Sequence, residues 1–231
     1  MEKILIVDFG GQYSQLIARR VREQHVYAEI KPYSRMSPEE IKAAGYKGVI
    51  LTGGPKSVYQ PGSPRCSEEL LNVGVPVLGI CYGAQLIAYL AGGTVSPAGN
   101  AGEYGKTALK AVSCRLFFGV PPVSDCWMSH TDYISRLPEG FIAVAHTDQC
   151  LCAALCDERR GLYGVQFHPE VTHTEYGRQI IQNFLFSICR CKGEWRVESY
   201  AQQLIQKYSA SLRGKRVLLA LGFRCGGAFA A

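Results

Sequence analysis

The feature that most constrains the fold of this chain is a short strand that runs through Gly79-x-Cys81-x-Gly83 directly into a helix. Residues 75–80 form an apolar stretch, and residues 82–91 have the pattern of a helix. The two glycines allow a tight turn and force the residue at its tip into a strained backbone. The spacing is the thiol counterpart of the Gly-x-Ser-x-Gly elbow. It predicts that Cys81 is a nucleophile whose thiolate is favoured by the helix N-terminus; the alternative is an ordinary buried cysteine.

The remaining sequence up to this elbow alternates between strand and helix. Short apolar strands separated by helices predict an α/β fold with a doubly wound, mostly parallel open sheet. Residues 94–165 have shorter strand patterns and turns, which predict a smaller, partly antiparallel insertion. A helix over 175–188 is expected to close the domain. The predicted elements before the insertion are strands 3–7, 26–30, 48–52 and 76–80 and helices 12–24, 38–44, 66–72 and 82–91.

A candidate base for the thiol lies in the segment that follows residue 161. Residues 162–167 are predicted to form a strand that ends at His168, and Glu170 lies two residues further on. A cysteine nucleophile needs a base to accept its proton, and that base needs a third group to fix its tautomer. A lone histidine after a strand is more often a surface residue, but the elbow and His-x-Glu together favour a Cys81–His168–Glu170 triad.

The strand over 48–52 ends in a Gly-Gly-Pro turn, Gly53 to Pro55. Backbone N–H groups exposed at such a turn can stabilise an oxyanion, together with the N–H group just after the nucleophile. Gly54 and Tyr82 are therefore the predicted oxyanion-hole donors. By itself, Gly-Gly-Pro is an ordinary turn.

Four segments together resemble the class I, or triad-type, glutamine amidotransferases. These segments are Asp8–Arg22, Leu51–Val58, Gly79–Gln85 and Gln166–Val171. The first segment, and Gly193-Glu-Trp near the end, resemble the glutaminase domain of GMP synthases in particular. The resemblance covers residues 1–221, and four motifs in the same order make chance agreement improbable.

The resemblance implies roles for these residues. Cys81 would attack the side-chain amide of L-glutamine, His168 would act as base and then acid, and Glu170 would orient His168. Glu103-Tyr104-Gly105 would lie in a loop that faces a synthetase partner. Thr131 departs from the family, which usually has glycine at this position of the substrate loop. The residues expected to bind the substrate are Gly53, Gln85, Ser129, His130, Thr131 and Asp132.

Composition narrows the remaining classes of function. With 231 residues, 47% of them hydrophobic, the chain can bury a large core. It has no apolar run of 18 residues and no room for a signal before the first strand, so we expect a cytoplasmic protein without a membrane partner. Its ten cysteines are then expected to be reduced. Two Cys-x-Cys pairs, Cys150/Cys152 and Cys189/Cys191, are interpreted as parts of strands, in which both thiols would lie on one face. Their spacing is not that of zinc ligands, so no metal site is predicted.

The last part of the chain differs from the rest. Residues 178–231 have nine Lys and Arg against two Asp and Glu, whereas residues 1–177 have 16 against 17. The basic residues are not interleaved with aromatic ones, so a solvated or partner-facing surface is favoured over nucleic-acid binding. Residues 196–211 are predicted to be a helix, and 215–221 a strand. We expect a glutaminase domain over 1–193 and, over 194–231, a linker and the truncated start of an ATP-pyrophosphatase domain.

The resemblance places ATP and Mg²⁺ only in that synthetase domain, so no cofactor is expected in this chain. In GMP synthases, a Ser-Gly-Gly phosphate loop follows the strand at 215–221, but here the sequence continues as Gly222-Phe-Arg-Cys. The expected reaction is glutamine hydrolysis, with the ammonia used by a synthetase domain or subunit to aminate XMP. Two alternatives stay open: a docking or regulatory subunit without turnover, and a γ-glutamyl hydrolase or peptidase on the same fold.

Overall fold

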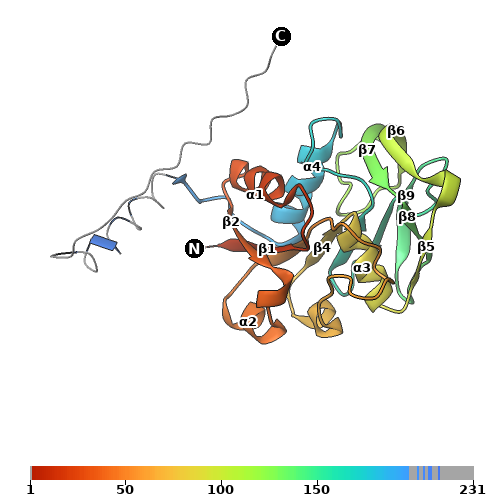
Figure 1. The fold of residues 1–231 in the computed structure, drawn as a ribbon. Helices are drawn as coiled ribbons and strands as arrows, with labels where there is room; N and C mark the ends of the chain where they lie inside the picture. The colour runs from red at the N-terminus through yellow and green to blue at the C-terminus, as the bar shows by residue number, and fades with distance from the viewer. Residues whose placement is uncertain (1, 198–201, 203–204, 206–207, 210–212, 214–231) are drawn as a thin grey trace, which may run out of the picture. The chain divides into compact units, whose positions relative to one another are not determined.

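The structure is a computed structural model that describes residues 2–197 and the single positions 202, 205, 208, 209 and 213 (Figure 1). The chain divides into two units, Met1–Trp195 and Arg196–Ala231. The first unit contains all the predicted site residues. In the described part of the chain, no helix is both long and apolar enough to cross a bilayer.

The first unit is built on a nine-stranded sheet with the order β2-β1-β3-β4-β11-β10-β9-β6-β7. Its first five strands are parallel to one another. β1, β3, β4 and β11 are almost fully buried, because helices cover both faces of this half of the sheet. The parallel strands are β1 (Lys3–Asp8), β2 (Tyr27–Pro32), β3 (Gly48–Leu51), β4 (Val77–Ile80) and β11 (Leu162–Val165).

The other half of the sheet is antiparallel. The antiparallel strands predicted within residues 94–165 are present, and four of them continue the same sheet beyond β11. Two more strands pair in a small second sheet. The strands of the main sheet are β6 (Glu103–Ala111), β7 (Val123–His130), β9 (Ile142–His146) and β10 (Ala154–Asp157), and those of the small sheet are β5 (Thr94–Pro97) and β8 (Asp132–Arg136).

Helices lie on both faces of the sheet, as the doubly wound prediction requires. α1 (Ser14–Glu23) and α4 (Gly177–Gln182) lie together on one face, and α2 (Pro38–Ala43) and α3 (Tyr82–Leu90) lie on the other (Figure 1). Two hydrophobic cores follow from this arrangement. Ile17, Val21 and Phe184 belong to the first core, and Ile41 and Leu86 to the second.

Two predicted helices differ in type from the expectation. Residues 66–72 form only a short 3₁₀ helix, η2 (Glu68–Asn72), in which the Ser67 hydroxyl accepts a hydrogen bond from the N–H of Glu69. The predicted helix over 175–188 is α4 followed by a π-helical segment, η4 (Asn183–Ile188). Asn183 donates side-chain hydrogen bonds to the carbonyls of Leu116 and Phe118, which draws the last turns of the helix toward that loop.

The two Cys-x-Cys pairs do not lie in strands, so the strand interpretation of them was wrong. Cys150 and Cys152 lie in a turn before β10, and Cys189 and Cys191 follow η4. All four thiols are buried, and each of the nine cysteines that the structure describes is free. The predicted strand over 215–221 lies outside the described residues, as does most of the predicted helix over 196–211. Within that range, Val197, Gln202, Ile205, Tyr208 and Ser209 are described as helical.

Candidate active site

Cys81 occupies the sharp turn between β4 and α3. Its φ is +53° and its ψ −109°, a combination that residues with a Cβ rarely adopt. Only glycine fits at positions 79 and 83, because neighbouring backbone leaves no room for a Cβ. A Cβ at Gly79 would clash with the backbone of Gly83, and a Cβ at Gly83 would clash with the carbonyl of Leu51. The N–H of Cys81 donates to the carbonyl of Val165 on the neighbouring strand, at 2.8 Å. The backbone thus fixes the position of the thiol.

His168 and Glu170 follow β11, which is the parallel neighbour of β4. The carboxyl ends of the two strands therefore lie side by side, and this brings His168 to the thiol. Nδ1 of His168 lies 2.7 Å from Oε1 of Glu170. This pairing directs Nε2 of the ring away from the carboxylate and leaves it as the nitrogen available to Cys81. The structure brings the three residues of the predicted triad together.

The surroundings of His168 change its acidity. Burial alone would lower its pKa, but the interactions with the Cys81 thiol and the Glu170 carboxylate outweigh burial and raise the pKa to about 10. Glu170 is completely buried, and its second oxygen, Oε2, has no hydrogen-bond partner among the described residues. At neutral pH the imidazolium form of His168 is therefore favoured beside Cys81.

The backbone of His168 and Glu170 is held by residues that the sequence analysis did not identify. The Thr174 hydroxyl donates to the carbonyl of His168 at 2.6 Å, and Nε of Arg20, on α1, donates to the carbonyl of Glu170 at 2.8 Å. The ring of Tyr13 meets the His168 ring edge-on, with 5.1 Å between the ring centroids. Tyr13 and Arg20 lie within the first of the four motif segments, but that motif alone does not reveal their contacts.

The two predicted oxyanion donors lie beside the thiol. The N–H of Tyr82 is the first of α3, and the N–H groups of a helix's first turn have no partner within the helix. Gly54 packs against the Tyr82 ring so closely that a Cβ there would lie 2.9 Å from it. In the described part of the chain, no hydrogen bond engages the N–H of Gly54 or that of Tyr82. Both groups remain available to an oxyanion.

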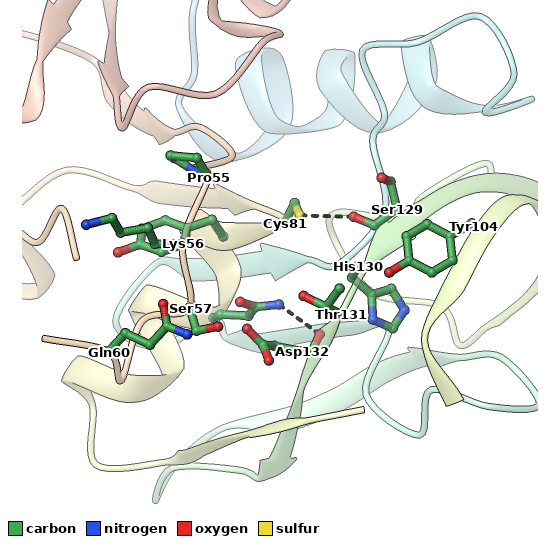
Figure 2. A pocket seen from close by; sticks show the side chains of 13 residues that line it. Pro55, Lys56, Ser57, Gln60, Cys81, Tyr104, Ser129, His130, Thr131 and Asp132 are labelled. Atoms are coloured by element: carbon green, nitrogen blue, oxygen red, sulfur yellow. Dashed lines mark hydrogen bonds between the residues drawn. The ribbon is translucent and has the colours of Figure 1, made fainter. Parts of the chain in front are cut away.

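A cavity of about 380 Å³ opens on one side of Cys81 (Figure 2). The thiol lies on its wall, 3.7 Å from the carbonyl oxygen of Ser129. Most of the predicted substrate-binding residues line this cavity, and they come from three segments that are distant in the sequence. Tyr104 also lines it and has 65% of its surface exposed. Its predicted lining residues are Gly54, Cys81, Tyr82, Gln85, Ser129, His130, Thr131 and Asp132, and its other lining residues include Lys56, Ser57 and Gln60.

A second cavity, of about 330 Å³, lies on the other side of the thiol. His168 and Tyr13 line it, together with the glycine-rich turn at Gly10 and Gly11. Gly53, which was expected to bind substrate, lines this second cavity rather than the first. Only Gly54, Pro55, Cys81 and Ser129 line both cavities. Cys81 can thus be approached from two directions.

Gln85 has a second role in addition to lining the first cavity. Its Nε2 donates to the carbonyl of Asp132 at 2.9 Å and to Oε1 of Gln166 at 3.0 Å. Nε2 of Gln166 in turn lies 3.6 Å from the sulfur of Cys81. Gln166 belongs to the last motif segment, but its sequence context assigned it no role. It precedes His168 by two positions, a spacing that puts both on one face of an extended segment.

The backbone at Thr131 does not need the glycine that the family usually has at this position. Its φ is not positive, since the only described non-glycine residues with positive φ are His25, Cys81 and Arg190. The Thr131 carbonyl accepts a 2.7 Å hydrogen bond from the N–H of Ala98. The departure from the family pattern therefore does not strain this loop.

One buried cluster has donor atoms of the kind that bind metals. Atoms of Glu103, His130 and Cys150 lie within 4.8 Å of one another. The Thr147 hydroxyl already donates to the Glu103 carboxylate, whose two oxygens lie 2.8 and 2.9 Å away, and closed zinc sites have four ligands rather than three. The cluster is therefore better described as a hydrogen-bonded network than as a metal centre.

Comparisons with known proteins agree with this geometry. Residues 5–188 match the family model "Glutamine amidotransferase class-I". The chain is 53% identical over 221 residues to a GMP synthase [glutamine-hydrolyzing] of Clostridium tetani, and 52% identical over 222 residues to those of Clostridium botulinum strains. These alignments cover 95% of this chain but 43% of each relative, so the chain spans less than half of their length.

Solved structures resemble it as well. A protein described as one subunit of a GMP synthase, from Thermoplasma acidophilum, is 35% identical with a TM-score of 0.73, over 90% of this chain and 98% of that one. A glutamine amidotransferase from Thermotoga maritima shares the fold at 20% identity, with a TM-score of 0.60, over 90% of this chain and 85% of that one.

Proposed function

This chain belongs to the class-I glutamine amidotransferase family, and on that premise we propose that it hydrolyses L-glutamine to L-glutamate and ammonia. The observation that carries the proposal is the meeting of Cys81, at the strained elbow, with the His168–Glu170 pair at the end of the adjacent parallel strand. The free N–H groups beside the thiol and the polar cavity that it faces support the same reaction.

In the first half of the reaction, the Cys81 thiolate attacks the side-chain amide carbon of glutamine. The carbonyl oxygen becomes an oxyanion, which the N–H groups of Gly54 and Tyr82 stabilise. The His168 imidazolium gives its proton to the amide nitrogen, the carbon–nitrogen bond breaks, and ammonia leaves. A glutamyl thioester on Cys81 and a neutral His168 remain.

In the second half, His168 acts as a base. It takes a proton from water, and the water oxygen attacks the thioester carbon. The carbon–sulfur bond then breaks, which releases glutamate and restores the thiolate–imidazolium pair. Glu170 keeps Nδ1 of His168 protonated throughout, so that Nε2 is the nitrogen that exchanges protons.

We assign the first cavity to glutamine because its polar lining suits an amino acid. Gln85, the segment Ser129–Asp132, Lys56 and Ser57 all line it. We assign the second cavity, which His168 lines, to ammonia and water. In the proposed reaction, His168 donates a proton to the departing ammonia and accepts a proton from the attacking water. Gly53 would then border the route of ammonia rather than the bound substrate.

The names of the relatives suggest how the ammonia is used. We propose that an ATP-pyrophosphatase domain, in the same polypeptide or in a separate chain, uses it to aminate XMP to GMP. In this proposal, residues 1–193 are the glutaminase domain, and residues 194–231 lead into the synthetase part. The 43% coverage of the GMP synthase relatives and the almost complete coverage of the Thermoplasma protein support both arrangements.

The deciding experiment measures glutamate release by the purified chain, alone and with an added ATP-pyrophosphatase domain that has ATP, Mg²⁺ and XMP. We expect glutamate release that is lost in Cys81→Ala, and GMP formation only with the added domain. An unchanged rate in Cys81→Ala would refute the assignment of the nucleophile. No glutamate release under either condition would favour a docking role, and faster hydrolysis of γ-glutamyl peptides than of glutamine would favour a γ-glutamyl hydrolase.

A further inference from the structure

A buried polar cluster lies directly behind the substrate loop, although the sheet around it is apolar. Glu103 begins β6, and His130 ends β7 at the position paired with it. Directly paired residues of antiparallel strands share a face, so both side chains point into the same interior space. Glu103 is 8% exposed and His130 5%, whereas their nearest buried neighbours along the strands are the apolar Met128 and Leu109.

The direction of the hydrogen bond between Thr147 and Glu103 can be deduced. The Thr147 hydroxyl accepts hydrogen bonds from the N–H groups of Gln149 and Cys150, at 3.3 and 2.8 Å. Its single hydrogen must therefore point to Glu103, whose two oxygens lie 2.8 and 2.9 Å away. The remaining contact of the carboxylate is with His130, whose Nε2 lies 3.3 Å from Oε2 of Glu103.

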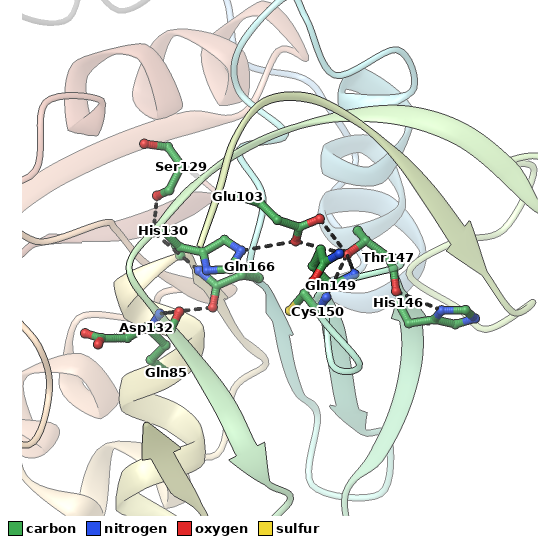
Figure 3. Close-up of polar contacts among 11 residues, drawn as sticks. Gln85, Glu103, Ser129, His130, Asp132, His146, Thr147, Gln149, Cys150 and Gln166 are labelled. Atoms are coloured by element: carbon green, nitrogen blue, oxygen red, sulfur yellow. Dashed lines mark hydrogen bonds and ion pairs between the residues drawn. The ribbon is translucent and has the colours of Figure 1, made fainter. Parts of the chain in front are cut away.

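The cluster has a cost that a purely structural role does not explain. Nδ1 of His130 is buried without a hydrogen-bond partner among the described residues. Burying a carboxylate and leaving a ring nitrogen unpaired both oppose folding, and an apolar pair would satisfy this position better. Glu103 and Thr147 lie on the far side of His130 from Ser129 and Asp132 (Figure 3).

The backbone of His130 belongs to the segment Ser129–Asp132 that forms the wall of the first cavity. At its far end, this segment is tied down through Asp132, whose carbonyl accepts from Gln85 and whose Oδ1 accepts from the hydroxyl of Tyr59 at 3.0 Å. At its near end, the carbonyl of Ser129 faces the thiol. The interaction of His130 with Glu103 is the anchor between these two ends.

We propose that Glu103 and Thr147 are positioning residues, which hold His130 and through it the backbone of Ser129–Asp132 in the conformation that binds the amino-acid end of the substrate. This inference rests on the proposed glutaminase function. Glu103 contacts neither Cys81 nor the first cavity, so its effect falls on substrate binding and not on the attack of the thiol.

The test compares Glu103→Gln, Thr147→Val and Thr147→Ser with the unaltered chain. The first two variants should raise KM for glutamine about 10-fold, the effect of losing one hydrogen bond to a charged group, and change kcat less than about threefold. Thr147→Ser keeps the hydroxyl and should retain the original KM. The matched control is Asp157→Asn, which removes another buried carboxylate, on β10 and paired with Arg160, and should leave KM unchanged.

A second readout does not depend on turnover. Iodoacetamide should alkylate Cys81, and L-glutamate in the first cavity should slow this labelling, as followed by mass spectrometry of the Cys81 peptide. Glu103→Gln should be alkylated at the original rate without ligand but need about 10-fold more glutamate for protection. An unaltered KM and unaltered protection in Glu103→Gln would overturn the inference.

The two proposals fail in different ways. Protection by glutamate without any glutamate release from glutamine would refute the glutaminase proposal, while the variants would still test the positioning role. A parallel loss of kcat and of folded protein in both Glu103→Gln and Asp157→Asn, with KM constant, would show that the cluster is only structural and would overturn the inference.

Discussion

The strain at Cys81 leads to an unusual prediction: glycine at position 81 should give a more stable protein than alanine. At φ +53° and ψ −109° the backbone lies outside the regions open to residues with a Cβ. Holding such a residue there costs about 1–3 kcal/mol. Alanine keeps this strain, because it keeps the Cβ, whereas glycine releases it.

The expected difference follows from two opposing effects. Glycine costs about 0.5–1 kcal/mol relative to alanine at an ordinary position, because it has more freedom in the unfolded chain. Subtracting this from the strain leaves about 1 kcal/mol in favour of Cys81→Gly over Cys81→Ala. In a domain of this size, that difference raises Tm by about 2–4 °C. The half-buried methyl group of alanine adds little, since Cys81 lies on a cavity wall.

Thermal and urea unfolding of the two variants, followed by circular dichroism in one buffer, measure this difference. The control is Ala88→Gly, the same exchange within α3, where helical backbone makes glycine unfavourable by about 1 kcal/mol or more. Both variants at position 81 lack the thiol, so neither has glutaminase activity that could confuse the comparison. If Cys81→Gly were less stable than Cys81→Ala, as at position 88, the elbow would not be strained and the argument would be wrong.

Three further predictions concern the neighbouring residues. Because folding raises the pKa of His168 from 6.5 to about 10, the stability that protonated His168 contributes should be complete below pH 6.5 and disappear as the pH rises toward 10. Urea unfolding across this range should show the decline in stability, and His168→Gln should abolish that decline. Glu170→Gln should lower kcat for glutamine hydrolysis about 10²-fold, since His168 loses the group that orients it; a rate within about threefold of the original would contradict that role. Gly83→Ala should destabilise the protein by about 1–3 kcal/mol in urea unfolding, because its Cβ would run into the carbonyl of Leu51; equal stability would show that the turn can open.

The sequence was sufficient to predict the elements that depend on local pattern. The elbow at Cys81 could be predicted because two glycines, an apolar strand and a helix stand in one short segment. The position of His168 followed from the rule that the carboxyl ends of parallel strands share an edge. The 3₁₀ form of Glu68–Asn72 was not predictable in the same way, since the residues suit either helix and only packing decides between them.

The contacts that hold the site in place could not be predicted, because they depend on register between distant strands. Glu103 and Thr147 are 44 residues apart, and Arg20 and Glu170 are 150 apart. Nothing in the sequence near Thr147 indicates that its hydroxyl meets a carboxylate. The antiparallel character of residues 94–165 was predicted, but their pairing was not, because alternating patterns do not reveal which strand they pair with.

The two cavities that meet at Cys81 have a kinetic consequence for the proposed reaction. Glutamate forms in the cavity that glutamine must enter, whereas the nitrogen leaves toward the side that His168 lines. Accumulated glutamate should therefore compete with glutamine for the free enzyme. Ammonium, which accumulates on the other side, should slow the reaction only by reversing the formation of the thioester. Product inhibition measured with each compound separately would thus report on which face of the thiol each one uses.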